Sequence, residues 1–369
     1  MKHFLLVISL LLLFSCTEND NSEEYNKKPT VKIGIQLPLS GDVAFAGNSA
    51  REAMLMEFEK IQNSKNLKYK YELLFEDVGL SAKTSAIVAN KFINADKVNA
   101  IISMWSIAGN VVAPIAEKNK IPSFTSSYGE QSTRGKYNFN LNPLFDEVAY
   151  IMSNQLIKNN IKKVALFVKN IGGNLELRDA LIKSFDKNKI EVTHNELFHS
   201  EAKDFRISIN KSLSKNPQMH IIIGTVPTPY IFVKQLKEIA GDDIDITSVD
   251  GFSEMPPQQA QIVNGKWLID TGTFGTDEFV NELKAKKNVQ AYSNSGSMAA
   301  NLVIVVDAFE SSISNQDRIP NSNEILNWIW KNVKNYDTPV GKVTIVNDGL
   351  MKSNSVVKKI VNGRAVSIK

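Results

Sequence analysis

An alternation of strand-like and helix-like segments is the feature that most restricts the fold of this chain. In its clearest example, an apolar run at 100–104 is followed by a helical pattern at 111–116 and by a second apolar run at 121–125. Strand-like segments at 31–37 and 70–75, each followed by a helical pattern, precede it. Strands that alternate with helices in this way predict a doubly wound parallel α/β sheet in the first 130 residues.

A second series of the same kind begins near residue 146. Strands are predicted there at 163–168, 190–197, 219–224, 245–249 and 266–270. Because one core rarely serves more than about 300 residues, two such units in tandem predict two Rossmann-like lobes. The segment 295–312 is apolar almost all round, so we expect a helix buried against an existing sheet and no third domain.

The N-terminus has the features of an export signal. Residues 1–16, MKHFLLVISLLLLFSC, combine a basic start with an apolar core that is too short for a comfortable membrane span. The tetrad ending at Cys16, the only cysteine, resembles the lipobox of bacterial lipoproteins, which implies lipidation of this residue. The polar segment 17–30 is then a solvated tether. We therefore expect an extracytoplasmic protein of the bacterial cell envelope that is anchored to a membrane without crossing it.

The charge of the chain argues against one class of partner. The chain has 43 basic and 39 acidic residues, which gives a formal net charge of +4. The lysines are scattered among acidic neighbours, as on an ordinary solvated surface. So slight a bias gives no reason to expect nucleic acid binding.

Two serines at predicted strand ends are the first candidate site residues. Ser106 follows the apolar run at 100–104, and Ser127 follows the run at 121–125. The carboxyl ends of neighbouring parallel strands open onto a common crevice, where helix N-termini and hydroxyls can hold a small anion. The two serines are therefore candidates for a carboxylate seat. Both could equally be helix caps, a frequent role of serine.

The order and spacing of several motifs resemble the type I periplasmic solute-binding proteins, and among them the branched-chain amino acid (leucine/isoleucine/valine) binding proteins of ABC transporters. The matching residues span nearly the whole mature chain and are, in order, 32–35, 38–41, Gly47, Glu76, Asp77, Ser106, 113–116, Ile121, Pro122, Asp204, Phe205, Asp250, Gly251 and Gly341. The resemblance implies a Venus-flytrap in which three crossovers join two lobes. We place lobe 1 at 31–142 plus 272–338, and lobe 2 at 143–271 plus 339–369.

The same resemblance implies roles for particular residues. In the amino-acid binders of this family, a serine at the position of Ser106 takes the ligand carboxylate. Backbone groups at the positions of Ser127 and Gly129 help to hold the carboxylate and the ammonium, and an acid at the place of Asp250 neutralises the ammonium. On residues alone, Asp250 before a glycine is also typical of an ordinary turn.

Departures from the family pattern bear on the ligand. Gly129 stands where a threonine is common, so only its backbone N–H is left, and Ala46 replaces a tyrosine that commonly closes the pocket, with Phe45 beside it. Trp105 and Tyr128 flank the two serines and are candidates either for the pocket wall or for lobe packing. A small aliphatic amino acid is the family default, and the family also binds amides, urea and aromatic acids.

Nothing in the sequence favours catalysis. No nucleophile elbow, P-loop or GxGxxG motif occurs, and His194, His199 and His220 have no metal-ligand spacing. We expect His194 and His199 at the surface, and neither an enzyme nor a bound cofactor or metal. The resemblance implies a monomer that delivers its ligand to an ABC permease. A ligand sensor or cell-envelope partner protein with the same fold is the alternative.

Overall fold

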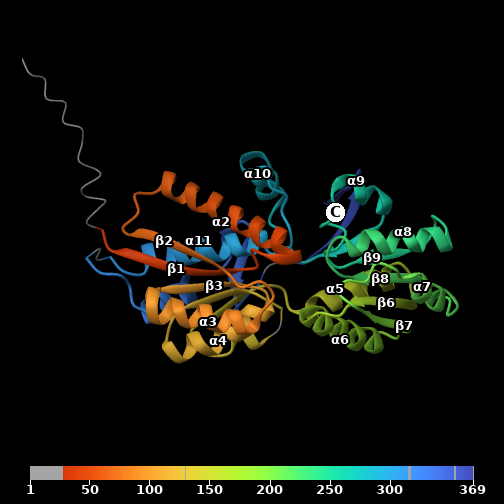
Figure 1. Cartoon of the computed structure of the whole chain (residues 1–369), viewed down its shortest axis with the longest axis horizontal. Helices are drawn as coiled ribbons and strands as arrows, with labels where there is room; N and C mark the ends of the chain where they lie inside the picture. The colour runs from red at the N-terminus through yellow and green to blue at the C-terminus, as the bar shows by residue number, and fades with distance from the viewer. Residues whose placement is uncertain (1–27, 129, 315–316, 353–354, 369) are drawn as a thin grey trace, which may run out of the picture.

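The computed structural model describes residues 28–128, 130–314, 317–352 and 355–368. The predicted signal segment, Cys16, most of the tether and Gly129 lie outside these residues. Figure 1 shows the described elements in two lobes that lie side by side along the long axis of the molecule. Each lobe contains a parallel sheet with helices on both faces, which confirms the predicted flytrap-type α/β fold.

The first lobe is built on a sheet of eight strands in the order β11-β12-β13-β5-β4-β3-β1-β2. Neighbouring strands from β13 to β2 pair in parallel, whereas β11, β12 and β13 pair antiparallel with one another. The strands are β1 (Thr30–Leu37), β2 (Lys70–Asp77), β3 (Ala100–Met104), β4 (Ser123–Ser126), β5 (Asn138–Leu141), β11 (Tyr336–Thr338), β12 (Gly341–Ile345) and β13 (Leu350–Lys352). All of β3 and β4 is buried, as expected of central parallel strands.

Helices cover both faces of this sheet. On one face α2 (Ala44–Ser64), α11 (Ser295–Ser311) and α12 (Ser322–Asn332) share one core with the strands, and on the other α3 (Ala82–Lys91) and α4 (Ser106–Asn119) form a second core (Figure 1). The predicted apolar helix is α11, which is buried along most of its length. The sequence patterns did not predict α12, nor α10 (Asp277–Lys287), which packs on α2.

The second lobe contains a parallel sheet of four strands in the order β7-β6-β8-β9. Its strands are β6 (Lys163–Lys169), β7 (Glu191–Phe198), β8 (Met219–Ile223) and β9 (Ile246–Ser248). A bridge between Val249 and Ile269 connects it to the antiparallel strands β10 (Trp267–Asp270), β14 (Val356–Val361) and β15 (Arg364–Ser367). One core packs beneath α5 (Phe145–Lys158) and α6 (Gly172–Lys187), and the other beneath α7 (Arg206–Leu213), α8 (Thr228–Ala240) and α9 (Pro257–Ala260).

One lobe boundary differs from the prediction. Residues 339–369 were assigned to the second lobe, but β12 and β13 belong to the first sheet, where Leu350 is paired with Asn140 of β5. Only β14 and β15 join the second lobe. The chain therefore crosses between lobes three times: after β5, after β10, and between β13 and β14. The pairing of β13 with β5 joins residues about 210 positions apart, which no local pattern reveals.

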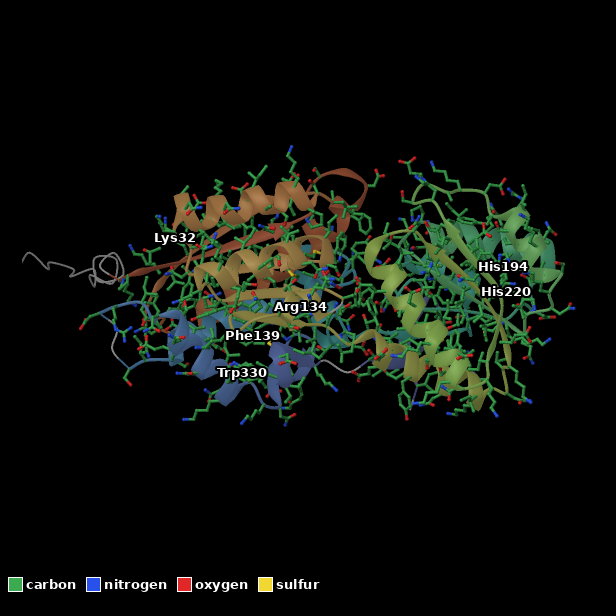
Figure 2. All side chains as sticks on the ribbon, turned by 90° about the horizontal axis from the view of Figure 1, so that it is seen from below. Lys32, Arg134, Phe139, His194, His220 and Trp330 are labelled. Atoms are coloured by element: carbon green, nitrogen blue, oxygen red, sulfur yellow. The ribbon has the colours of Figure 1, made fainter. Side chains whose placement is uncertain are left out.

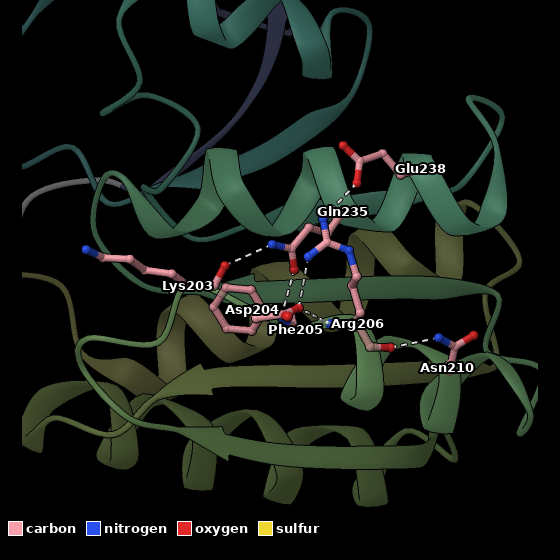
Figure 3. Close-up of polar contacts among 7 residues, drawn as sticks. All are labelled: Lys203, Asp204, Phe205, Arg206, Asn210, Gln235 and Glu238. Carbon is pink, nitrogen blue, oxygen red and sulfur yellow. Dashed lines mark hydrogen bonds and ion pairs between the residues drawn. The ribbon is translucent and has the colours of Figure 1, made fainter.

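Two polar features of the second lobe are structural. Figure 3 shows the Asp204-Phe205 motif at the start of α7, where Phe205 N–H donates to Gln235 Oε1 of α8 at 2.7 Å.

Figure 2 shows His194 and His220 inside this lobe, and the predicted surface position of His194 is wrong because its side chain is only 8% exposed. Burial lowers the pKa of His220 to about 4. The sequence pattern missed this because His194 lies on a strand face that packs against Phe167.

No helix among the described residues combines the length and the apolar character that crossing a bilayer requires.

Candidate functional site

Ser106 connects the loops that follow β3 and β4. Its hydroxyl donates to the backbone carbonyl of Tyr128 at 2.6 Å and accepts from the backbone N–H of Tyr128 at 3.0 Å. It does not cap α4, since Trp105 occupies the N-cap position and no side chain makes a capping hydrogen bond there. The capping role that the sequence left open for Ser106 therefore does not apply. The loops that the sequence predicted to meet do meet at this residue.

Ser127 lies deeper in the first lobe and is fully buried. Its hydroxyl is hydrogen bonded to Ser132 Oγ at 2.6 Å, and both its backbone groups are hydrogen bonded to the Asn140 side chain of β5. These contacts fix the backbone that leads into Tyr128. The described structure thus gives the Ser127 hydroxyl a partner within its own lobe, so Ser127 fixes the position of the Tyr128 backbone.

Trp105 makes the turn from β3 into α4 in an unusual conformation. Its backbone has φ +68° and ψ 161°, a region that favours glycine and costs a larger residue about 1–3 kcal/mol. Its N–H donates to Ser126 O at 2.8 Å, and its ring packs against the core of the first lobe. Strain of this kind concentrates at functional sites. Here it places Ser106 beside the β4 loop.

Tyr128 spans the two lobes. Its ring stacks on Phe145 of α5 with centroids 4.6 Å apart, and its hydroxyl donates to Asp250 Oδ2 at 3.3 Å. Burial, followed by the nearby charge of Asp250, holds its pKa well above the ordinary value. The lobe-packing role that the sequence left open for Tyr128 is therefore present. The same side chain completes a hydrogen-bonded path from Ser106 in one lobe to Asp250 in the other.

Asp250 lies between the lobes. It follows β9 with φ +56°, and its carboxylate accepts from Thr271 N–H at 2.8 Å and from Thr271 Oγ1 at 2.7 Å. Thr271 is the first residue after β10, where the chain begins its crossing to the first lobe. With 7% of its surface exposed, Asp250 is not a solvated turn residue. Burial, then the charge of Asp270, raises its pKa to about 8.

Two charged residues near Asp250, namely Glu254 and Lys169, match no sequence motif. Glu254 is 4% exposed, accepts from Val226 N–H at 3.3 Å, and has its pKa raised to about 7 by burial. Lys169 ends β6 and donates to Thr225 Oγ1 at 3.2 Å, and burial lowers its pKa. One signal could have found them. Lys169, Asp250 and Glu254 lie at or after the carboxyl ends of strands of one parallel sheet, and these ends meet at one edge.

The start of α6 in the second lobe faces Ser106 and Tyr128. A Cβ atom added to Gly173 would lie 3.4 Å from Tyr128 Cδ2 and 4.0 Å from Ser106 Oγ. The N-termini of α4 and α6 therefore approach the same place from the two lobes. Both present partial positive charge there, which favours an anion.

Phe45, the remaining candidate, is at the start of α2. Its ring packs edge to face on Tyr292, with centroids 4.6 Å apart, and against the core of the first lobe. Gln290, two residues before Tyr292, donates to the Glu254 carbonyl at 3.3 Å, so this aromatic pair lies near the side of the first lobe that faces Glu254. Burial, then the charge of Glu254, raises the pKa of Tyr292.

The chemistry of the assembled groups is that of recognition. Helix N-termini and the Ser106 hydroxyl suit an anion, whereas Asp250 and Glu254 suit a cation, so the set matches a small zwitterion. Within the part of the chain that the structure describes, no three His, Cys, Asp or Glu side chains gather in a way that could hold a metal ion.

Comparison with known proteins identifies the family. The model of the family described as periplasmic binding protein matches residues 30–364. A leucine binding protein from Thermotoga maritima is similar with TM-score 0.78 and 23% identity, over 92% of this chain and 98% of that one. A branched-chain amino acid transporter substrate binding protein from Streptococcus pneumoniae, in complex with isoleucine, has TM-score 0.77 and 22% identity, over 92% and 100%. A solute binding protein from R. palustris, in complex with benzoate, has TM-score 0.80 and 15% identity, over 92% and 95%. With nearly its whole described length matched, this chain belongs to the periplasmic binding protein family.

Proposed function

We propose that this protein captures a small amino acid, or a related ligand with an α-amino acid headgroup, between its two lobes and delivers it to an ABC importer. The observation that carries the proposal is the hydrogen-bonded path from Ser106 through Tyr128 to Asp250. A single side chain, that of Tyr128, separates the Ser106 hydroxyl of the first lobe from the buried carboxyl group of Asp250 in the second. That combination suits a ligand with opposite charges on adjacent atoms.

In the proposed complex the ligand carboxylate lies at the first lobe. The Ser106 hydroxyl exchanges its hydrogen bond to the Tyr128 carbonyl for one to the carboxylate, while the Ser127 N–H stays bonded to Asn140. The backbone N–H at Gly129, which the family resemblance implies, and the N-terminus of α4 assist. The ligand ammonium then takes the position at Asp250 that the Tyr128 hydroxyl occupies, and the three crossovers bend to close the lobes. Burying both charges is favourable only when each has a partner, so ligands that lack one group bind weakly.

The solved relatives support a carboxylate ligand. Two of these relatives are complexes with isoleucine and with benzoate, which share a carboxylate and little else. The buried Asp250 distinguishes between the two in this chain, because it offers an acceptor for an ammonium that benzoate does not have. We therefore favour an amino acid over an aromatic acid.

The N-terminus supports attachment of the protein to a membrane. Residues 1–16 have the pattern of a lipoprotein signal, and residues 17–30 have the composition of a tether. Lipidation of Cys16 would hold the binding lobes beside a permease in the same membrane. Labelling with a fatty acid probe tests this step: the wild-type protein should incorporate the label, and Cys16→Ala should lose it.

Calorimetry on the chain truncated after Cys16 tests the binding function. A thermal-shift screen against amino acids, amides and small carboxylates selects the ligand. Ser106→Ala and Asp250→Ala should each weaken its binding about tenfold to a hundredfold, since each leaves a charged ligand group unpaired. Ser200→Ala and Asp242→Ala, at exposed sites, are matched controls and should leave affinity unchanged. Unchanged affinity in both site variants would refute the assignment.

A further inference from the structure

Lys169 and Glu254 form a pair of opposite charges that the headgroup site does not use. Both belong to the second lobe and follow strands of one sheet, Lys169 at the end of β6 and Glu254 in the segment after β9. Consecutive residues of the loop after β8 hold them: Lys169 Nζ donates to Thr225 Oγ1 at 3.2 Å, and Val226 N–H donates to Glu254 Oε2 at 3.3 Å. The two charged groups are thereby fixed side by side.

The pair faces the first lobe. The backbone carbonyl of Glu254 accepts from Gln290 Nε2 of the first lobe at 3.3 Å. The charge of Glu254 also acts on Tyr128 and Tyr292, and the charge of Asp42, again in the first lobe, acts on Lys169. The backbone N–H of Glu254 donates to the Asp250 carbonyl at 3.3 Å, which places the pair next to the headgroup site.

The pair does not neutralise itself by direct contact. Among the described residues, no ion pair within 4.0 Å joins Lys169 to Glu254, although each feels the charge of the other. The Lys169 ammonium, which has three donors, makes one hydrogen bond to Thr225, and the Glu254 carboxylate accepts one from Val226. Two donors of the half-buried Lys169 and an acceptor of the buried Glu254 thus have no protein partner among the described residues, and a ligand can take them up.

We propose that Lys169 and Glu254 are specificity-determining residues that select a ligand with a carboxamide at its distal end. A primary amide carries an acceptor oxygen for the Lys169 ammonium and N–H donors for the Glu254 carboxylate. An aliphatic end satisfies neither and must desolvate both charges. A distal carboxylate meets Glu254 with like charge, and a distal ammonium meets Lys169 with like charge. This inference rests on the proposed amino acid binding and adds the class of side chain.

Calorimetric titration of the chain truncated after Cys16 with glutamine, asparagine, leucine, glutamate and lysine tests the proposal. The wild-type protein should bind at least one of the two carboxamides at least about tenfold more tightly than leucine, because the site's polar groups stay unpaired with leucine. Lys169→Met combined with Glu254→Leu should remove or reverse this preference. Lys163→Met, at the exposed opposite end of β6, is the matched control and should leave it intact.

The outcomes separate this inference from the proposed function. Leucine binding as tightly as both carboxamides, with an unchanged preference in the double variant, overturns the specificity pair and leaves amino acid capture standing. Tighter binding of glutamate or lysine than of either carboxamide also overturns it. Binding of none of the five amino acids refutes capture of an amino acid and the specificity pair together. Glu254→Gln, which keeps the shape of the side chain, provides a folded variant if Glu254→Leu does not fold, and it should weaken carboxamide binding at least about threefold while affecting leucine less.

Discussion

Ligand binding should release a proton from Asp250. Because the pKa of Asp250 is raised to about 8, most of these carboxyl groups are protonated at pH 7 in the ligand-free protein. Burial is the main cause, and the neighbouring charges of Asp270 and Glu254 add to it, whereas hydrogen bonds from Thr271 act in the opposite direction. A ligand ammonium beside the carboxylate favours its ionised form and lowers the pKa. If the pKa in the complex falls below about 5, binding at pH 7 releases up to about one proton from Asp250.

The sign of the pH dependence follows from the same shift. The free protein holds the proton and the complex does not, so affinity should rise with pH by close to a factor of ten per unit and level off above about pH 8. Titration calorimetry at pH 7 in two buffers of different ionisation enthalpy measures the released protons from the difference in apparent enthalpy. Glu254, with a pKa of about 7, adds up to about half a proton if it also ionises, and Glu254→Gln isolates the Asp250 contribution.

Asp250→Asn should abolish the Asp250 part of this release while keeping the shape of the side chain. Equal apparent enthalpies in both buffers for the wild-type protein would refute the reasoning, because they would mean that no carboxyl group changes its protonation on binding.

Three predictions concern stability. Burial lowers the pKa of His220, so on acidification the imidazole is protonated in the unfolded chain before it is in the folded one. The free energy of unfolding should therefore fall by about 2 kcal/mol between pH 7.5 and pH 5 through His220 alone. In urea unfolding, His220→Gln should lose less stability over this range than His199→Gln. Gly47→Ala should destabilise by about 1–3 kcal/mol, since its Cβ would lie 2.0 Å from Pro38 O, and an unchanged melting temperature would contradict this. Lys358→Met should lower the free energy of unfolding in urea by about 3–5 kcal/mol, because it removes the ion-pair partner of buried Asp270. A decrease below about 1 kcal/mol would show that the fold does not depend on this ion pair.

The sequence predicted most elements of the fold because their patterns are local. The predicted strand 100–104 coincides with β3, and the apolar helix predicted at 295–312 is α11. The helix α10 is highly charged, so its short apolar face gave no clear period, although Thr276 is a good N-cap that could have marked its start. The places of β12 and β13 depend on pairing between distant segments, so no local signal could assign them to a lobe.

In the candidate site, too, some residues could be predicted from the sequence and others could not. Ser106 and Asp250 follow strands and match motifs of a known family, and Tyr128 follows Ser127, so their meeting could be predicted. Lys169 and Glu254 match no motif, and on sequence alone they are a strand end and a loop residue. Only the folded second lobe brings them to consecutive residues of one loop.

The central claim, that Asp250 neutralises the ammonium of a ligand whose carboxylate lies at Ser106, is tested most directly by a cycle of protein and ligand changes. The amino acid that binds best, and its analogue with hydrogen in place of the α-amino group, are titrated into the wild-type protein and into Asp250→Asn. The wild-type protein should bind the analogue at least about tenfold more weakly, and Asp250→Asn should hold the two ligands within about a factor of two of each other. An equal loss in both proteins would show that Asp250 does not meet the ammonium.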